Sequence, residues 1–251
     1  MSEIKLGSST IFYELSGSGD PVILIHGFSL DHRMWQPQID FLSEKHQVVT
    51  YDMRGFGKSS LPIGKYSHHS DLLALLDSLQ LAKVTIIGLS LGGEVAIDFA
   101  LSCPQYLNKL LLASSSLGGY GSTVDWDVHA KEVGIEEAKK NWLNHSVFAP
   151  TMKNETTKEM LEKIVSDYSS WHWLNHDPRE KLQPTALTRL NEIKVPTEII
   201  VGANDLSYYH DIAKILNKEI SNSHLTIIPN SGHMVNLENL TEFNKVLQAV
   251  L

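Results

Sequence analysis

The 251-residue sequence contains one cysteine, Cys103, so it cannot form an internal disulfide. It also lacks any run close to the roughly 18 to 20 apolar residues that a membrane-spanning helix needs. Its first residues show neither the basic start nor the apolar stretch of a signal peptide. A single thiol and no targeting signal are typical of a reducing compartment. We therefore expect a cytoplasmic protein without a membrane span.

Positive charge is also scarce, because 21 Lys and Arg face 29 Asp and Glu, a net charge of −8. This balance argues against a nucleic-acid partner and gives no reason to expect binding to anionic membranes. The sequence has no internal repeat, no phosphate-binding loop ending in Lys-Ser/Thr and no dinucleotide fingerprint. We therefore expect neither a nucleotide cofactor nor a metal, and a small molecule as the partner.

Short apolar runs alternate with segments of helical spacing along most of the chain. The strand-like runs cover residues 4–6, 10–15, 22–25, 48–51, 84–87, 110–113, 197–201 and 225–228. The helix-like segments cover residues 34–46, 70–79, 91–103, 209–220 and 240–251. Alternation of buried-looking strands with helices predicts an α/β fold with a mostly parallel central sheet and helices on both faces. The first two runs, separated by Gly7-Ser8-Ser9, read as an N-terminal hairpin.

This alternation is interrupted between residues 117 and 190, where the sequence is strand-poor, helical in spacing and rich in tryptophan. We therefore divide the chain into a first core part (1–116), an inserted helical cap (117–190) and a second core part (191–251). Ligands of open α/β sheets bind at the carboxyl edge of the strands, which such an insertion would cover. Trp126, Trp142 and Trp171 are candidate substrate-binding residues there. For these three and for Trp173, two alternatives stay open: the wall of an apolar pocket or the core of the cap.

The segment from Val84 to Gly93 carries the clearest catalytic motif. Gly88-Leu89-Ser90-Leu91-Gly92 matches G-x-S-x-G and lies between a β-branched run and a helix. A serine at such a sharp turn has strained backbone geometry, and its flanking glycines let strand and helix approach closely. The N–H groups at the start of the helix can stabilise a developing negative charge. Ser90 is therefore the predicted nucleophile.

A serine nucleophile needs a base and an acid that orients the base. His233 follows the last strand-like run and Asp205 follows the preceding one, in the chain order Ser, Asp, His that this motif predicts. Rival acids are Asp125 and Asp127 in the cap, because residues 114–116, after another strand, are all serine. The sequence therefore favours Ser90, Asp205 and His233 as the catalytic residues.

An oxyanion hole also requires two backbone donors. One should be the N–H of Leu91, directly after the nucleophile. The second should come from the His26-Gly27-Phe28 loop, with the N–H of Phe28 as the donor and its ring in the pocket wall. We interpret His26 as a residue whose hydrogen bonds order this loop.

Two pairs of histidines invite a different reading. His172 and His176 are four residues apart in an expected helix, but no third ligand follows at the spacing of a metal site. We interpret them as part of a solvated helix face. His68 and His69, near the start of another helix, are expected at the surface.

Taken together, these motifs resemble the α/β-hydrolase fold superfamily. The resemblance rests on His26-Gly27-Phe28, Tyr51-Asp52-Met53-Arg54-Gly55-Phe56-Gly57-Lys58-Ser59, the Ser90 motif, Val195-Pro196-Thr197, Gly202-Ala203-Asn204-Asp205 and Gly232-His233. Within the superfamily, the chain is most similar to small capped carboxylesterases and 3-oxoadipate enol-lactonase-like serine hydrolases. The resemblance implies cleavage of an ester or lactone of a small, largely apolar substrate through an acyl-enzyme on Ser90, without a cofactor.

Three alternatives remain open. The same catalytic residues would serve a C–C bond hydrolase or a cofactor-free perhydrolase, although perhydrolases often carry Met where this chain has Leu91. Some members of the fold act as small-molecule receptors with slow residual hydrolysis. Haloalkane dehalogenases carry Asp at the position of Ser90, so the serine excludes their chemistry.

Overall fold

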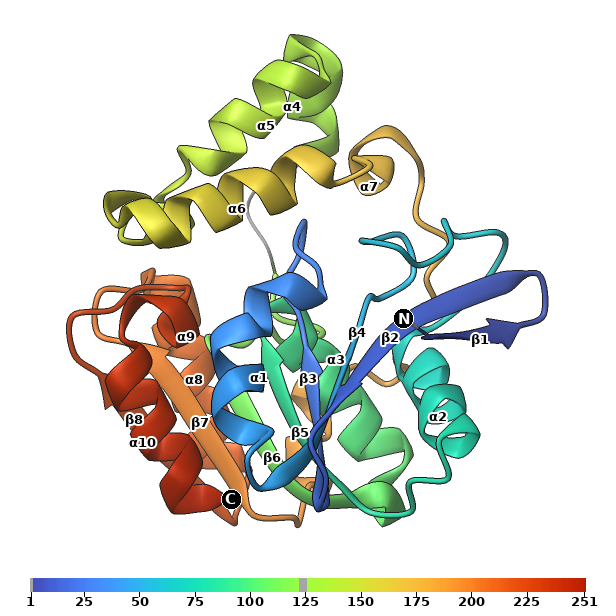
Figure 1. Ribbon diagram of the computed structural model, residues 1–251, viewed down its shortest axis with the longest axis vertical. Coiled ribbons are helices and arrows are strands. Elements are labelled where there is room, and N and C mark those ends of the chain that lie inside the picture. Colours follow the sequence, from blue (N-terminus) through green and yellow to red (C-terminus); the bar gives the residue numbers. More distant parts are fainter. Residues whose placement is uncertain (1, 122–125) are drawn as a thin grey trace.

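The computed structural model describes residues 2–121 and 126–251. Its centre is a sheet of eight strands in the order β1-β2-β4-β3-β5-β6-β7-β8 (Figure 1). The strands are β1 (Ser2–Leu6), β2 (Ser9–Ser16), β3 (Asp20–Ile25), β4 (His46–Tyr51), β5 (Val84–Leu89), β6 (Leu107–Ala113), β7 (Thr197–Gly202) and β8 (Ser223–Ile228). β1 and β2 form an antiparallel hairpin, β2 pairs antiparallel with β4, and the remaining pairs are parallel. The predicted hairpin and mostly parallel sheet are confirmed.

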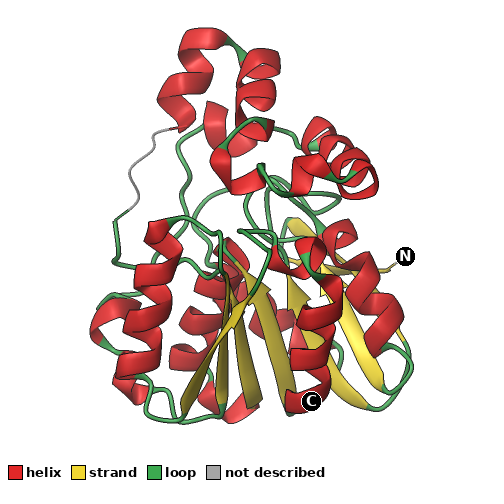
Figure 2. Cartoon of the chain, turned by 90° about the vertical axis from the view of Figure 1, so that its left-hand side faces the viewer, coloured by secondary structure: helices red, strands yellow, loops and turns green. Residues whose placement is uncertain are grey.

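Helices cover both faces of the sheet (Figure 2). They are α1 (Gln36–Leu42), α2 (His68–Ser78), α3 (Leu91–Ser102), α8 (Ser207–Glu219), α9 (Val235–Glu238) and α10 (Leu240–Val250). Alternate residues of β3 enter two separate hydrophobic clusters, because successive side chains of a strand point to opposite faces. Ile23 and Ile25 pack with α2, α3 and α8, whereas Val22 and Leu24 pack with α1 and α10. The sheet is thus buried on both sides.

The helix expected over residues 34–46 is shorter in the structure. A 3-10 turn, η1 (His32–Trp35), precedes α1, which ends at Leu42. Pro37 lies in the first turn of α1, where the absence of its N–H breaks no helical hydrogen bond. The apolar spacing therefore indicated a helix but overestimated its length.

Between β6 and β7 the chain forms the helices α4 (Trp126–Val133), α5 (Ile135–Leu143), α6 (Glu155–Asp167) and α7 (Trp171–Leu174). We call residues 126–174 the helical segment. It lies over the end of the sheet where β5 meets Ser90 (Figure 1). Arg33 of η1 donates a hydrogen bond of 2.9 Å to Asp167 of α6, which ties the segment to the sheet domain. No helix in the described ranges has the length and apolar character that a bilayer crossing requires.

Candidate active site

Ser90 lies at the turn between β5 and α3, with φ 55° and ψ −115°. A positive φ is unusual for a residue with a side chain and marks a turn that the surrounding structure enforces. A Cβ on Gly88 would overlap the carbonyl of Gly92, and one on Gly92 would overlap the carbonyl of Ile25. The motif therefore has glycine at these positions because strand and helix leave no room for a side chain.

His233 and Asp205 lie on the loops that follow β8 and β7. The Nδ1 atom of His233 is 3.3 Å from Oδ2 of Asp205. The Asp205 side chain is fully buried, and its Oδ1 accepts a 2.7 Å hydrogen bond from the Leu206 N–H. A buried carboxylate in this position favours the imidazole tautomer with the proton on Nδ1, which leaves Nε2 free as a base.

Ser90 and His233 line the same cavity, so the structure brings the predicted nucleophile, base and acid together. Within residues 2–121 and 126–251, no hydrogen bond joins the Ser90 hydroxyl to His233. In unliganded enzymes this contact is often loose and tightens when substrate binds. The serine hydroxyl instead contacts Tyr209.

Tyr209, in the first turn of α8, is a site residue that the sequence analysis missed. Its ring centroid is 4.1 Å from that of His233, and its hydroxyl interacts with Ser90 and Ser116. Burial raises the pKa of Tyr209 to about 12, although the contact with Ser90 lowers it. The phenol therefore stays protonated at neutral pH, and contacts that lower its pKa are those in which a serine hydroxyl donates to the phenol oxygen. The sequence feature that could have indicated Tyr209 was its position four residues after Asp205.

Replacing Tyr209 with Phe removes this hydroxyl and keeps the ring against His233. We expect kcat to fall roughly fivefold with little change in KM, the scale of one lost hydrogen bond of about 1 kcal/mol. Steady-state kinetics with a p-nitrophenyl ester measures the effect. Tyr106→Phe is the control, because its hydroxyl donates to Asp77 and lies outside this cavity. Wild-type kcat in Tyr209→Phe would show that the hydroxyl does not act on Ser90.

The residues predicted to supply the oxyanion donors line the same cavity as Ser90. Leu91 is the first residue of α3, so its N–H has no acceptor within the helix, and Leu91 and Phe28 both line the cavity. His26 orders the Phe28 loop as expected: its Nε2 accepts from the Met53 N–H at 3.0 Å, and its Nδ1 is 2.8 Å from the Gly27 carbonyl. Burial lowers the pKa of His26, which keeps it neutral. The oxyanion role itself stays a prediction.

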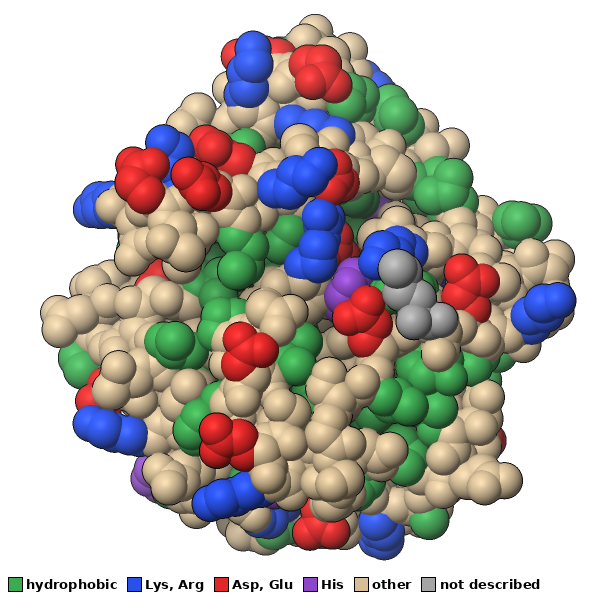
Figure 3. Space-filling model, in the orientation of Figure 1, with side chains coloured by type: hydrophobic (Ala, Val, Ile, Leu, Met, Phe, Trp, Pro, Cys, Tyr) green, Lys and Arg blue, Asp and Glu red, His purple; other side chains and the backbone are tan. Residues whose placement is uncertain are grey.

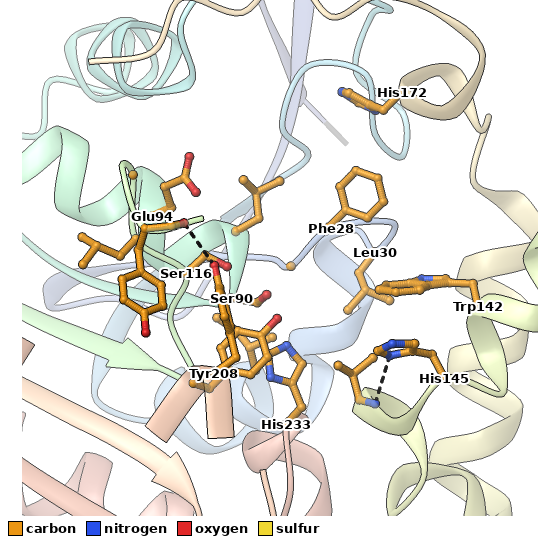
Figure 4. A pocket seen from close by; sticks show the side chains of 18 of the residues that line it. Phe28, Leu30, Ser90, Glu94, Ser116, Trp142, His145, His172, Tyr208 and His233 are labelled. Carbon is orange, nitrogen blue, oxygen red and sulfur yellow. Dashed lines mark hydrogen bonds between the residues drawn. The ribbon is translucent and has the colours of Figure 1, made fainter. Parts of the chain in front are cut away.

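The cavity has a volume of about 840 Å³, within the usual range for small-molecule sites. Its two ends differ in chemistry, with Ser90 and His233 between them (Figure 4). One end is apolar and aromatic, formed by Phe28, Leu30, Trp142, Phe148 and Trp173. The other is polar, formed by Glu94, Ser116, Asp177, Arg179 and Tyr208. In the space-filling view, hydrophobic side chains reach the surface where the helical segment meets the sheet domain (Figure 3).

Comparison with known proteins now decides the family. The model of the alpha/beta hydrolase family matches residues 22–246. The chain belongs to this family. Among curated relatives, it is 30% identical to 3-oxoadipate enol-lactonase 2 of Acinetobacter baylyi, over 95% of this chain and 92% of that protein. It is also 30% identical to 2-hydroxy-6-oxononadienedioate/2-hydroxy-6-oxononatrienedioate hydrolase 2 of Pseudomonas putida, over 94% and 89%.

Among solved structures, Est816, described as an N-acyl homoserine lactone degrading enzyme, superimposes with a TM-score of 0.82. It is 26% identical to this chain, and the match covers 100% of both chains. The predicted α/β-hydrolase fold is thereby confirmed, and the protein is a hydrolase. The matches cover nearly the whole chain, so they include the helical segment over the site.

The tryptophans of this hydrolase lie in different surroundings. Trp142 lines the cavity, and its Nε1 donates a 2.6 Å hydrogen bond to Ser29, next to Phe28. Trp173, for which the sequence left both the pocket wall and the core of the cap open, is buried and also lines the cavity. In the described ranges Trp171 is not a lining residue, and it contacts His172 edge-on at 5.1 Å. The side chain of Trp126 lies outside the described part of the structure.

The rival acids can be placed only in part. Asp127 lines the cavity but pairs with Lys131 at 3.2 Å, and its side chain is 46% exposed. Asp125 lies outside the described residues. Among the described side chains, the carboxylate that accepts a hydrogen bond from Nδ1 of His233 is that of Asp205.

Two expectations for the histidines were wrong. His68 is buried rather than at the surface, and this burial holds its pKa well below the usual value. His172 and His176 do not share a helix face, because α7 ends at Leu174. The ring of His172 instead stacks on Phe56 at 4.3 Å, and burial lowers its pKa to about 4. The imidazole of His172 is part of the packing between the helical segment and the sheet domain, a long-range contact that local spacing does not reveal.

Within the described residues, one group has the composition of a metal site: Asp31, His32 and Asp52, all buried. Its carboxylates already have partners. Asp52 accepts hydrogen bonds from His32 Nδ1 at 2.7 Å and from two backbone N–H groups, and Asp31 pairs with Arg33 at 2.6 Å. Internal pairing accounts for this cluster, so we assign it a structural role in holding the loops after β3 and β4.

Proposed function

We propose that this hydrolase cleaves a carboxylic ester or lactone of a small, largely apolar substrate through an acyl-enzyme on Ser90. The observation that carries the proposal is the placement of Ser90. Its strained backbone presents the hydroxyl to a cavity that it shares with His233, whose Nδ1 is bonded to the buried Asp205. A serine, a base and an orienting carboxylate are the groups that acyl transfer requires.

In this mechanism, the Ser90 oxygen attacks the carbonyl carbon while Nε2 of His233 takes the serine proton. The N–H groups of Leu91 and Phe28 stabilise the oxyanion of the tetrahedral intermediate. The imidazolium, stabilised by Asp205, donates its proton to the departing alcohol oxygen. A water molecule then attacks the acyl-enzyme with His233 again as the base, which releases the acid and restores Ser90.

A panel of esters, lactones and thioesters with graded acyl lengths tests the proposal. We expect sustained turnover of at least one short ester or lactone, many product molecules per enzyme. A receptor with residual hydrolysis would complete only a few slow cycles. Absence of turnover on the whole panel would contradict the proposed function.

A C–C bond hydrolase is the second candidate, favoured by the similarity to the Pseudomonas putida hydrolase. The same serine would attack a ketone carbonyl after transferring its proton to the same histidine. The carbon atom of the leaving group would then accept the proton from His233. Adding a β-diketone-type substrate to the panel separates the two candidates. Faster cleavage of that compound than of every ester and lactone would favour the C–C reaction.

We propose that the helical segment is a cap that sets substrate size, with Trp142 in the acyl site. Trp142→Ala should enlarge the apolar end, so that the preferred acyl chain becomes longer, mainly through KM. Trp171→Ala is the matched control, because Trp171 is not among the described lining residues. The measurement is kcat and KM across the acyl series for both variants. An unchanged acyl-length profile in a folded Trp142→Ala protein would place the acyl group elsewhere.

A further inference from the structure

The polar end of the cavity contains a cation that is already paired with carboxylates on two sides. Nη2 of Arg179 is 3.4 Å from Oε1 of Glu94, and its Nε is 3.9 Å from Oδ2 of Asp177. The side chains of Arg179 and Glu94 are only 17% and 16% exposed, so solvent screens their interaction weakly. All three residues line the cavity. The guanidinium is therefore neutralised before any substrate enters.

Glu94 also has a defined position relative to the nucleophile. Glu94 lies in the first turn of α3, which begins directly after Ser90, and its N–H donates a hydrogen bond of 3.1 Å to the Ser90 carbonyl. Figure 4 shows Glu94 and Tyr208 on the same side of Ser90, away from Phe28 and Trp142. A group a few bonds from the reacting carbonyl would therefore meet Glu94.

The charge of Glu94 acts on two neighbouring groups. Burial, and next the charge of Glu94, raise the pKa of Asp98 to about 7, although Arg179 and Arg189 lower it. The same two causes raise the pKa of Tyr208. The other charged lining residues lie toward solvent: Asp127 pairs with Lys131, and Lys181 is exposed. Lys181, the cation of these two lining residues, is therefore screened by solvent and adds little positive charge beside Glu94.

We propose that this polar end binds an uncharged, hydrogen-bonding group of the substrate and rejects a carboxylate, with Glu94 as the residue that sets the preference. The inference rests on the proposed ester or lactone hydrolysis and narrows its substrate class. A hydroxyl or amide can donate to Glu94 and accept from Arg179. Because it is uncharged, its burial carries no cost of desolvating an unpaired charge. A carboxylate would lose its hydration and be repelled by Glu94. The attraction of Arg179 would not offset this cost, because Glu94 and Asp177 already neutralise the guanidinium.

Three hexanoate esters of the same six-carbon alcohol test this, with the released acid measured by titration. They differ only at the far end of the alcohol chain, which carries a primary amide, a carboxylate or an ammonium group, because the acyl chain is proposed to occupy the apolar end beside Trp142. With spontaneous hydrolysis subtracted, wild-type kcat/KM should be about tenfold higher for the amide than for the carboxylate, the scale of one partly screened charge contact. Glu94→Gln leaves Arg179 less neutralised and should improve the carboxylate ester about tenfold relative to the amide, mainly through KM. Arg179→Gln should act in the opposite direction, weakening the carboxylate ester further and favouring the ammonium ester.

Glu192→Gln is the matched control, because Glu192 forms a similar pair with Arg189 outside the cavity, at 2.7 Å. It should leave the order of the three esters unchanged. A wild-type preference for the carboxylate ester, or an unchanged amide-to-carboxylate ratio in both cavity variants, would overturn the inference. If those results came with rapid turnover of p-nitrophenyl acetate, the proposed hydrolysis would stand and only the substrate class would fall. If wild type hydrolysed no ester at all, both would fall.

Discussion

Replacing Ser90 with alanine should lower kcat for the best ester or lactone of the panel by about a millionfold. The rate that remains would be the one that substrate binding and the oxyanion donors support without the serine. The acyl-enzyme requires the Ser90 oxygen, and no other described residue offers a hydroxyl in the same strained turn. The fold should persist, because the change removes one oxygen atom at a position 8% exposed. Steady-state kinetics and thermal unfolding of the purified variant provide the two measurements.

Ser102→Ala, at the exposed far end of α3, is the control for losing a hydroxyl from this helix. It should retain wild-type kcat. Substantial activity in Ser90→Ala, with a melting temperature close to that of wild type, would show that the reaction does not proceed through this serine.

Asp205→Asn should lower kcat by up to about 10⁴-fold while the protein stays folded. An asparagine can present its NH₂ group to Nδ1 of His233, which favours the tautomer with the proton on Nε2. That tautomer cannot accept the Ser90 proton, and the imidazolium would lose the buried carboxylate that stabilises it. The 3.3 Å contact between His233 and Asp205 makes this the carboxylate to test.

Asp211→Asn is the matched control on α8, because Asp211 is exposed and pairs with Lys214 at 3.2 Å. We expect wild-type kcat in this variant. Asp127→Asn tests the rival acid in the helical segment. If Asp127→Asn lost activity and Asp205→Asn kept it, the acid would come from the helical segment instead of the loop after β7.

Much of the core could be predicted from the sequence because its signals are local. The Gly88 to Gly92 motif encodes a steric requirement within five residues, and the structure confirms the strand, turn and helix around it. Asp205 and His233 each follow a parallel strand, and such strands end at one edge of a sheet. The sequence therefore predicted that these side chains meet, although the roles of the residues remain predictions.

The rest of the site depends on contacts between distant parts of the chain. The sequence does not show that Tyr209 reaches Ser90, because that depends on how α8 packs against the turn before α3. The stacking of His172 on Phe56 needs the space that Gly55 leaves, since a Cβ there would overlap the imidazole. The pairing of Arg179 with Glu94 joins positions 85 residues apart in the sequence. In our proposals substrate specificity depends on these contacts, which explains why motif analysis could not predict it.

The most direct test of the central claim is to identify the residue that reacts with a fluorophosphonate. The protein is incubated with the probe, the intact mass is measured, and the modified peptide is sequenced by mass spectrometry. We predict one adduct per chain, on Ser90, with loss of esterase activity in proportion to labelling and no adduct in Ser90→Ala. An adduct on another serine, or inactivation with Ser90 unmodified, would contradict the account.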